Sequence, residues 1–264
     1  MPINHAAEFE NELESFRSEA ESAIQFFYAW RTINEVASKD KQVVAALNKA
    51  PLFWNTSLGA LQTAAFIALG RVFDQEQNTH NIDRLIRIGQ MNPQIFTLDA
   101  LADRKRRGSS NANEWLDEYL ANAYVPNPED FRRLRKHVAA RRKIYAESFR
   151  PIRHQVFAHK QVADESHTYT LFANAKIAEI QKLMVFLRRL HIALWELFFN
   201  GRKLVLRPAR YSVTQMLAQP SAKGRSLQER LTRETEAFLK SIAEPRDKKQ
   251  LGLDLNKSLS AIKT

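Results

Sequence analysis

Three basic side chains lie close together between residues 153 and 159: Arg153, His154 and His159. Histidine suits both proton transfers of phosphodiester cleavage, because its unperturbed pKa of about 6.5 lies near working pH. Arginine suits the charge of a phosphorane-like transition state, because its planar guanidinium binds phosphate oxygens in pairs and stays protonated. These residue types are therefore a sufficient minimal set for cleaving RNA without a metal ion.

The spacing of Arg153 and His159 sets a condition on this chemistry. Six steps of about 100° in an ideal helix leave the two residues roughly 120° apart, so they do not share a face. Either the helix bends near His159, or the site faces a second subunit that supplies the same residues. Pro151 favours the first option, because proline lacks an N–H and clashes with the preceding turn. Symmetric pairing would satisfy the second option.

The composition is that of a globular chain with material for a sizeable core, since 44% of the 264 residues are hydrophobic. Only 7 glycines and 9 prolines are present, which favours long helices over an all-β fold. The absence of cysteine excludes disulfides, thiolate metal sites and cysteine nucleophiles, and it fits a reducing cytoplasm. The net charge of +11 favours polyanionic partners, either nucleic acids or anionic membrane surfaces.

Hydrophobic periodicity predicts an all-α fold, a bundle of long antiparallel helices with short helical insertions. Long helices are expected at residues 6–36, 51–74, 129–149 and 176–199. The second of these is apolar on nearly every side. Its most apolar part, residues 58–73, is too short to span a bilayer, so we expect a buried central helix. The N-terminus lacks a basic stretch followed by an apolar run, so we expect no signal peptide.

Several residues mark the ends of these helices. Asn127 is a plausible cap with Pro128 at the first helical position, and Pro151 should kink or restart the helix. Gly201 is well placed to end the last long helix. Beyond it, residues 203–207 could form a short strand or an extended arm. A final helix at residues 226–243 has a possible capping box, Ser226 with Glu229.

The helix at residues 129–149 is strongly basic. Phosphate-backbone binding needs such clustering, but a solvated helix face would have the same composition, and we weigh the two interpretations equally. The candidate RNA-binding residues are Arg132, Arg133, Arg135, Lys136, Arg141, Arg142 and Lys160. Trp115, Tyr119 and Tyr124 are expected to pack rather than to stack on bases, and His191 is expected to be a buried core histidine.

Arg71 and Asp74 stand three residues apart on the apolar helix. They could form an intrahelical ion pair, or they could orient the catalytic arginine or histidine from behind. The sequence contains no glycine-rich phosphate loop, no clustered histidines and carboxylates at metal spacing, and no Gly-x-Ser-x-Gly elbow. We therefore predict neither a metal site nor a cofactor.

The chain resembles the HEPN superfamily, whose helical bundles carry an arginine, a polar residue and then a histidine after four to six intervening residues. Here Arg153 is followed by the polar His154 and, after five intervening residues, by His159. The strings FRPIRHQVFAHK at residues 149–160 and LGRVFDQEQNTHNIDRLI at residues 69–86 resemble the AbiU-like abortive-infection branch. The resemblance covers roughly residues 5–200. It predicts a HEPN-like helical domain at residues 1–200 and a C-terminal extension at residues 201–264, made of an extended arm, one helix and a partly mobile tail.

The resemblance implies a metal-independent endoribonuclease acting in phage defence or as a toxin. It would use Arg153 and His159 directly, with His154 as the polar neighbour. The implied partners are RNA, a second copy with the motif near the interface, and possibly an antitoxin protein, but no membrane. Some HEPN toxins carry a tyrosine, modified by a partner nucleotidyltransferase, where this chain has Gln161, so that control is not expected. The alternative is a non-catalytic helical module that binds nucleic acid or protein through the same basic surface.

Overall fold

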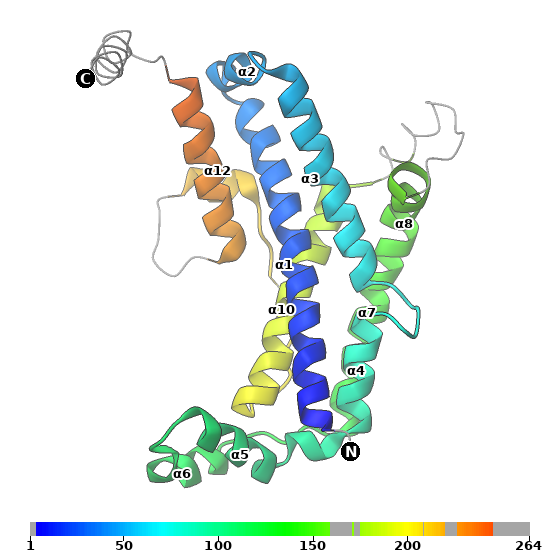
Figure 1. The fold of residues 1–264 in the computed structure, drawn as a ribbon, viewed down its shortest axis with the longest axis vertical. Helices are drawn as coiled ribbons and strands as arrows, with labels where there is room; N and C mark the ends of the chain where they lie inside the picture. The colour runs from blue at the N-terminus through cyan, green and yellow to red at the C-terminus, as the bar shows by residue number, and fades with distance from the viewer. Residues whose placement is uncertain (1–3, 159–170, 172–174, 208, 220–225, 245–264) are drawn as a thin grey trace, which may run out of the picture. The chain divides into compact units, whose positions relative to one another are not determined.

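The computed structural model describes residues 4–158, 171, 175–207, 209–219 and 226–244, and all regular structure within these ranges is helical. This confirms the predicted all-α class. In chain order (Figure 1) the helices are α1 (His5–Ala37), α2 (Lys41–Leu47), α3 (Pro51–Val72), α4 (Ile82–Met91), η1 (Pro93–Phe96), α5 (Leu98–Gly108), η2 (Ala112–Glu114), α6 (Leu116–Ala121), α7 (Pro128–Ile144), η3 (Tyr145–Phe149), α8 (Arg150–Ile152), η4 (Arg153–Ala158), α10 (Ile177–Asn200), α11 (Val213–Ala218) and α12 (Leu227–Ala243).

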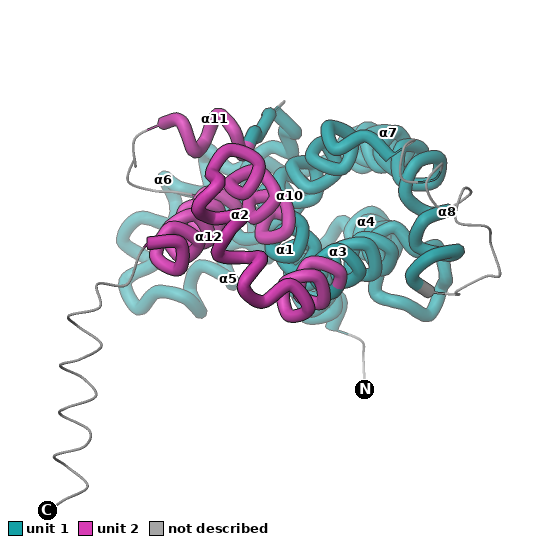
Figure 2. The backbone as a smooth tube through the Cα atoms, turned by 90° about the horizontal axis from the view of Figure 1, so that it is seen from above, with its two compact units in different colours: residues 1–27, 60–212 teal, residues 28–59, 213–264 magenta. Residues whose placement is uncertain are grey.

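The chain divides into two compact units (Figure 2). Unit 1 consists of residues 1–27 and 60–212, and unit 2 consists of residues 28–59 and 213–264. Helices α1 and α3 each contribute residues to both units. This division rests on packing, whereas the predicted boundary at residue 200 rests on a family resemblance, and that boundary stays a prediction.

The core of unit 1 forms where the regular apolar seam of α1 meets the apolar faces of other helices. Phe9 lies fully buried, with ring centroids 5.3 Å from Phe96 and 5.0 Å from Phe198. Along α10 the buried residues lie on one face, spaced mostly three and four apart, and they are Ile180, Leu183, Met184, Phe186, Leu187, Leu190, Ala193, Leu194, Leu197 and Phe198. Burial of so many large side chains gives the unit its main stabilisation.

Unit 2 has its own buried contacts. Helix α12 packs against α2, and the Thr32 hydroxyl donates to the Thr232 hydroxyl at 3.3 Å. The buried Glu35 carboxylate accepts from Lys39 and from the Thr214 hydroxyl, and these contacts lower its pKa to about 2. The predicted capping box at the start of α12 is confirmed, with Ser226 and Glu229 bonding reciprocally.

The predicted helix ends are also confirmed in unit 1. Asn127 caps α7 with Pro128 in the first turn, and Asp130 completes a capping box. Gly201 ends α10 in the left-handed region, with φ 57°, where a side chain would be strained and would meet Leu101. Residues 203–207 have no regular structure, which excludes the strand and leaves the extended arm.

Helix α3 corrects the expectation of a central helix buried on every side. Its buried residues begin only at Ala65, while Leu52 and Phe53 in its first turn are 81% and 63% exposed. By length and composition alone, α3 is also apolar enough to cross a membrane, although a single such helix is weak evidence for a span. The predicted helix at residues 51–74 is confirmed as α3. Apolar residues on all sides did not imply burial on all sides, because burial depends on which neighbours cover each face.

Candidate active site

The segment that carries Arg153 is a helix whose hydrogen-bond register changes twice. Helix α7 continues into the π-helical turn η3, a short α-helical stretch α8 that contains Pro151, and a second π-helical turn η4 that begins at Arg153. Proline lacks an N–H and clashes with the preceding carbonyl, so the chain around it cannot keep α-helical bonding. The helix thus continues through Pro151, and only its hydrogen-bonding pattern changes. Such π-bulges frequently occur at functional sites.

The Arg153 side chain lies directly on the backbone of Gly70 in α3. A Cβ atom added at Gly70 would lie 2.3 Å from Arg153 Nε and 2.5 Å from its Cδ. Only glycine therefore leaves room for the guanidinium in this position. Arg153 is half-buried, and its Nε has no hydrogen-bond partner among the described residues. Packing rather than an ion pair holds this arginine in place.

Aromatic contacts bring the same two stretches of chain together around Arg153. The Phe66 ring of α3 lies 6.0 Å from Phe149 and 5.2 Å from Phe157, measured between centroids. About two turns further along, Phe73 stacks on Tyr145 at 5.2 Å with an interplanar angle of 17°. Residues 66–73 therefore pack against residues 145–157. These ranges include residues 149–157 of one string that resembles the AbiU-like branch and residues 69–73 of the other.

Tyr145 places a buried hydroxyl beside Arg153. The residue is only 4% exposed, and its hydroxyl makes no hydrogen bond of ordinary length and angle among the described residues. Burial raises the pKa of Tyr145, which the nearby positive charges of Arg153 and Arg150 partly offset and the negative charge of Asp74 reinforces. The phenol therefore stays protonated at neutral pH and retains a proton that it can donate.

Only one of the two motif histidines, His154, lies among the described residues. His154 is half-buried in η4, directly after Arg153. His159 and Lys160 lie outside the described residues. The helix changes to π-helical hydrogen bonding in η4, immediately before His159, and both the predicted bend and the relation of Arg153 to His159 stay predictions.

Arg71 and Asp74 do not form the intrahelical ion pair that their spacing allowed. Arg71 Nη1 instead lies 3.2 Å from Glu19 Oε1 of α1. The Asp74 carboxylate accepts from the backbone N–H groups of Gln75 and Glu76, at 2.8 and 3.3 Å. The Asp74 carboxylate thus closes a tight turn just after α3. Its negative charge also contributes to the raised pKa of Tyr145. Arg71 points to another helix, and the orienting role proposed for it is untested.

The six candidate RNA-binding residues of α7 fall into two groups. Four of them have partners: Arg132 pairs with Glu129, Arg133 with Asp130 at 2.6 Å, Arg142 with Asp83 at 2.6 Å, and Arg141 lies 5.5 Å from the Phe186 ring centroid. Arg135 and Lys136 are exposed and form no ion pair within the described ranges. The latter two are therefore the strongest phosphate-binding candidates of the set, because they need not break an existing contact.

Comparison with known protein families identifies the family of the chain. The AbiU2 profile of the HEPN superfamily matches residues 6–219. The chain belongs to the HEPN AbiU2 family. No curated protein and no solved structure matches it significantly. The AbiU2 match runs past Gly201 to residue 219, so the family includes the extended arm and α11 that the resemblance over residues 5–200 left out.

Sequence reasoning found Arg153 but missed Gly70, Tyr145 and Arg150. Gly70 carried a usable signal, because an isolated glycine inside an apolar helical pattern usually has a packing reason. Arg150 stands three positions before Arg153, so its nearness could have been inferred from the sequence, whereas nothing in the sequence indicated that the Tyr145 hydroxyl is buried beside Arg153. Within the described ranges, no three histidine, cysteine, aspartate or glutamate side chains gather in a way that could hold a metal ion. A metal-independent reaction stays a prediction from residue type.

Proposed function

We propose that this AbiU2-family protein is a HEPN-type endoribonuclease that acts in phage defence or as a toxin, with Arg153 at the centre of its site. Membership of the family agrees with a ribonuclease or abortive-infection role. The observation that carries the proposal is the Arg153–Gly70 contact, where a guanidinium packs on a glycine backbone and has no carboxylate partner among the described residues. A fixed arginine without a counter-charge is suited to a phosphate that arrives with the substrate.

The proposed reaction needs only proton transfers and charge stabilisation. His159 takes the proton from the 2′-hydroxyl, and the 2′-oxygen then attacks the adjacent phosphorus. Arg153 stabilises the added negative charge on the non-bridging phosphate oxygens. The bond from phosphorus to the 5′-oxygen breaks, and that oxygen takes a proton from a protonated donor at the site. The products are a 2′,3′-cyclic phosphate and a free 5′-hydroxyl.

Tyr145 is a candidate for support of this step. Its pKa is raised, so its hydroxyl remains a proton donor, and it lies under the electrostatic influence of Arg153. From that place it can donate a hydrogen bond to the phosphate that Arg153 binds. His154 supplies a second imidazole next to the arginine, and the two histidines share the roles of base and acid between them.

The active form we propose is a homodimer with the motif near its interface. A second subunit would supply Arg153 and His159 across the symmetry axis, which satisfies the angular condition on their spacing. An antitoxin protein that covers the motif is a further proposed partner.

The experiment is an RNA cleavage assay with the full chain, in EDTA, on a single-stranded RNA. Arg153→Ala and His159→Ala should each abolish cleavage, whereas Arg230→Ala, on an exposed site of α12, should leave the rate unchanged. Wild-type rates in the first two variants would overturn the catalytic assignment. A folded protein that binds RNA but never cleaves it would favour the alternative, a non-catalytic binding module.

A further inference from the structure

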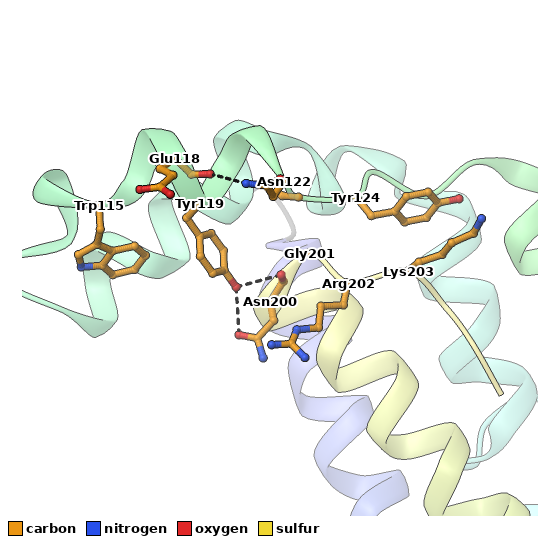
Figure 3. Close-up of a pocket in the computed structure, with 10 residues that line it drawn as sticks. Trp115, Glu118, Tyr119, Asn122, Tyr124, Asn200, Gly201, Arg202 and Lys203 are labelled. Carbon is orange, nitrogen blue, oxygen red and sulfur yellow. Dashed lines mark hydrogen bonds between the residues drawn. The ribbon is translucent and has the colours of Figure 1, made fainter. Parts of the chain in front are cut away.

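A hollow in unit 1 lies where α6 and its following turn meet the C-terminal end of α10 (Figure 3). Its volume is about 620 Å³, which is in the usual range for small-molecule sites. Helices α6 and α8 lie far apart in both Figure 1 and Figure 2, so this hollow is separate from the Arg153 site. The functional argument above makes no use of it.

The walls of the hollow are aromatic and held in place. Trp115 and Tyr119 meet edge to face, with centroids 5.5 Å apart, and Tyr124 stands further along the same wall (Figure 3). The Tyr119 hydroxyl donates to the Asn200 carbonyl oxygen at 2.9 Å, and the Tyr124 hydroxyl donates to Asp130 at 2.5 Å. Because both tyrosine hydroxyls are bound to protein, these half-buried side chains offer a ligand the faces of their rings.

Positive charge accompanies these rings. Lys203 Nζ lies 5.5 Å from the Tyr124 ring centroid, and it forms no ion pair within the described ranges. Lys105 does not line the hollow, but its Nζ lies 4.7 Å from the Tyr119 centroid and 2.7 Å from Asn200 Oδ1, and it forms no ion pair within the described ranges. Arg202 is 72% exposed and pairs with Glu196, and the exposed Glu118 adds one negative charge at the rim. The lysines without counter-charges favour an anion in this hollow.

From this geometry we infer that the hollow binds a nucleoside phosphate. The base stacks on the Trp115 and Tyr119 wall, and the phosphate lies against Lys203. The side-chain amides of Asn122 and Asn200 each already donate to protein, to the Glu118 carbonyl oxygen and the Glu196 carboxylate, which reduces what they offer to the edge of the base. Binding therefore depends on stacking and charge, and it discriminates little among the four bases.

The nucleoside phosphate has two sources, a free nucleotide or an unpaired nucleotide within an RNA chain. The second source rests on the proposed function, whereas the first does not. The test uses the full chain carrying Arg153→Ala, so that no RNA is cut and binding is read apart from cleavage. AMP and a single-stranded RNA hexamer are each titrated by calorimetry, at low and moderate salt.

Two variants report on the hollow and two serve as matched controls. Trp115→Leu and Lys203→Gln should each weaken binding by about ten-fold, because a stacked base and a phosphate contact contribute on that scale. Trp195→Leu, at a 40% exposed tryptophan of α10, and Arg230→Gln should change it less than two-fold, about the precision of the assay. Circular dichroism checks folding. If Trp115→Leu fails to fold, Lys203→Gln on the exposed arm carries the test.

Binding of both probes with equal loss in the two variants identifies a site for free nucleotide, and binding of the hexamer alone identifies an RNA subsite. Either result supports a nucleoside phosphate in this hollow. Failure of both probes to bind, or affinities that Trp115→Leu and Lys203→Gln leave unchanged, would overturn the inference. Neither outcome depends on whether Arg153 cleaves RNA.

Discussion

Replacing Gly70 by alanine should move the guanidinium of Arg153 while leaving the fold nearly intact. The new Cβ would lie 2.3 Å from Arg153 Nε, and an ordinary contact begins at 3.4 Å, so the side chain must move by about 1.1 Å. Because the clashing atoms belong to the end of a flexible side chain, that movement is cheap. Alanine also favours a helix over glycine by about 1 kcal/mol. The free energy of unfolding should therefore change by less than about 1 kcal/mol in either direction.

Activity should respond far more than stability. A misplacement of about 1 Å in a catalytic group can cost about 100-fold in rate. We therefore expect Gly70→Ala to lower the rate of RNA cleavage by about two orders of magnitude, at an unfolding midpoint close to that of the unaltered protein. Cleavage is measured with an end-labelled single-stranded RNA, and stability is measured by urea denaturation.

Gly59→Ala is the matched control on the same helix. Nothing lies within 4 Å of a Cβ added at Gly59, so this substitution should stabilise the protein by about 0.5–1 kcal/mol and leave cleavage unchanged. The reasoning is refuted if Gly70→Ala behaves in the same way as Gly59→Ala, with full activity and a gain in stability. That result would mean that Arg153 does not need its place on Gly70.

Three further changes test other parts of the structure. Tyr145→Phe removes a buried hydroxyl that makes no hydrogen bond of ordinary length and angle among the described residues, so stability should stay level or rise by up to about 1 kcal/mol while cleavage slows; an unchanged rate would remove Tyr145 from the site. The double variant Arg135→Gln with Lys136→Gln should make the salt dependence of RNA binding shallower by about 1.4 units of slope, and an unchanged slope would reassign both side chains to solvation. Burial, together with the charge of Arg17, lowers the pKa of His191 below its usual 6.5, so the unfolded chain takes up the proton first. Stability should then be greatest above pH 6.5 and fall as the pH drops below it, and urea denaturation of His191→Leu should show a weaker fall over that range.

Local rules in the sequence were enough to predict the helices. The Asn127–Pro128 start, the Ser226–Glu229 capping box and the left-handed Gly201 each depend on neighbours within a few residues. The periodic seams of α1 and α10 likewise indicated which faces are buried. Two short strings indicated the family, and the structure brings Gly70 of one against Arg153 of the other.

The site itself could be predicted only in part, because its contacts join residues that are far apart in the sequence. Nothing local says that Gly70 receives Arg153, which lies 83 positions further along the chain. The same holds for Arg142, whose partner Asp83 lies on another helix, so a residue counted as a free phosphate ligand is already engaged. Arg71 had an acidic neighbour three residues away and yet pairs with Glu19 of α1.

The central claim is that Arg153 stabilises the negative charge that forms when an RNA 2′-hydroxyl attacks the adjacent phosphorus. Mass spectrometry of the products, from an RNA and from the same sequence with a single 2′-deoxy nucleotide at the cleaved position, tests it most directly. We predict fragments ending in 2′,3′-cyclic phosphate and 5′-hydroxyl from the RNA, none from the deoxy-substituted position, and none from either substrate with Arg153→Ala. Cleavage at the deoxy position, or the same products at an undiminished rate from Arg153→Ala, would contradict it.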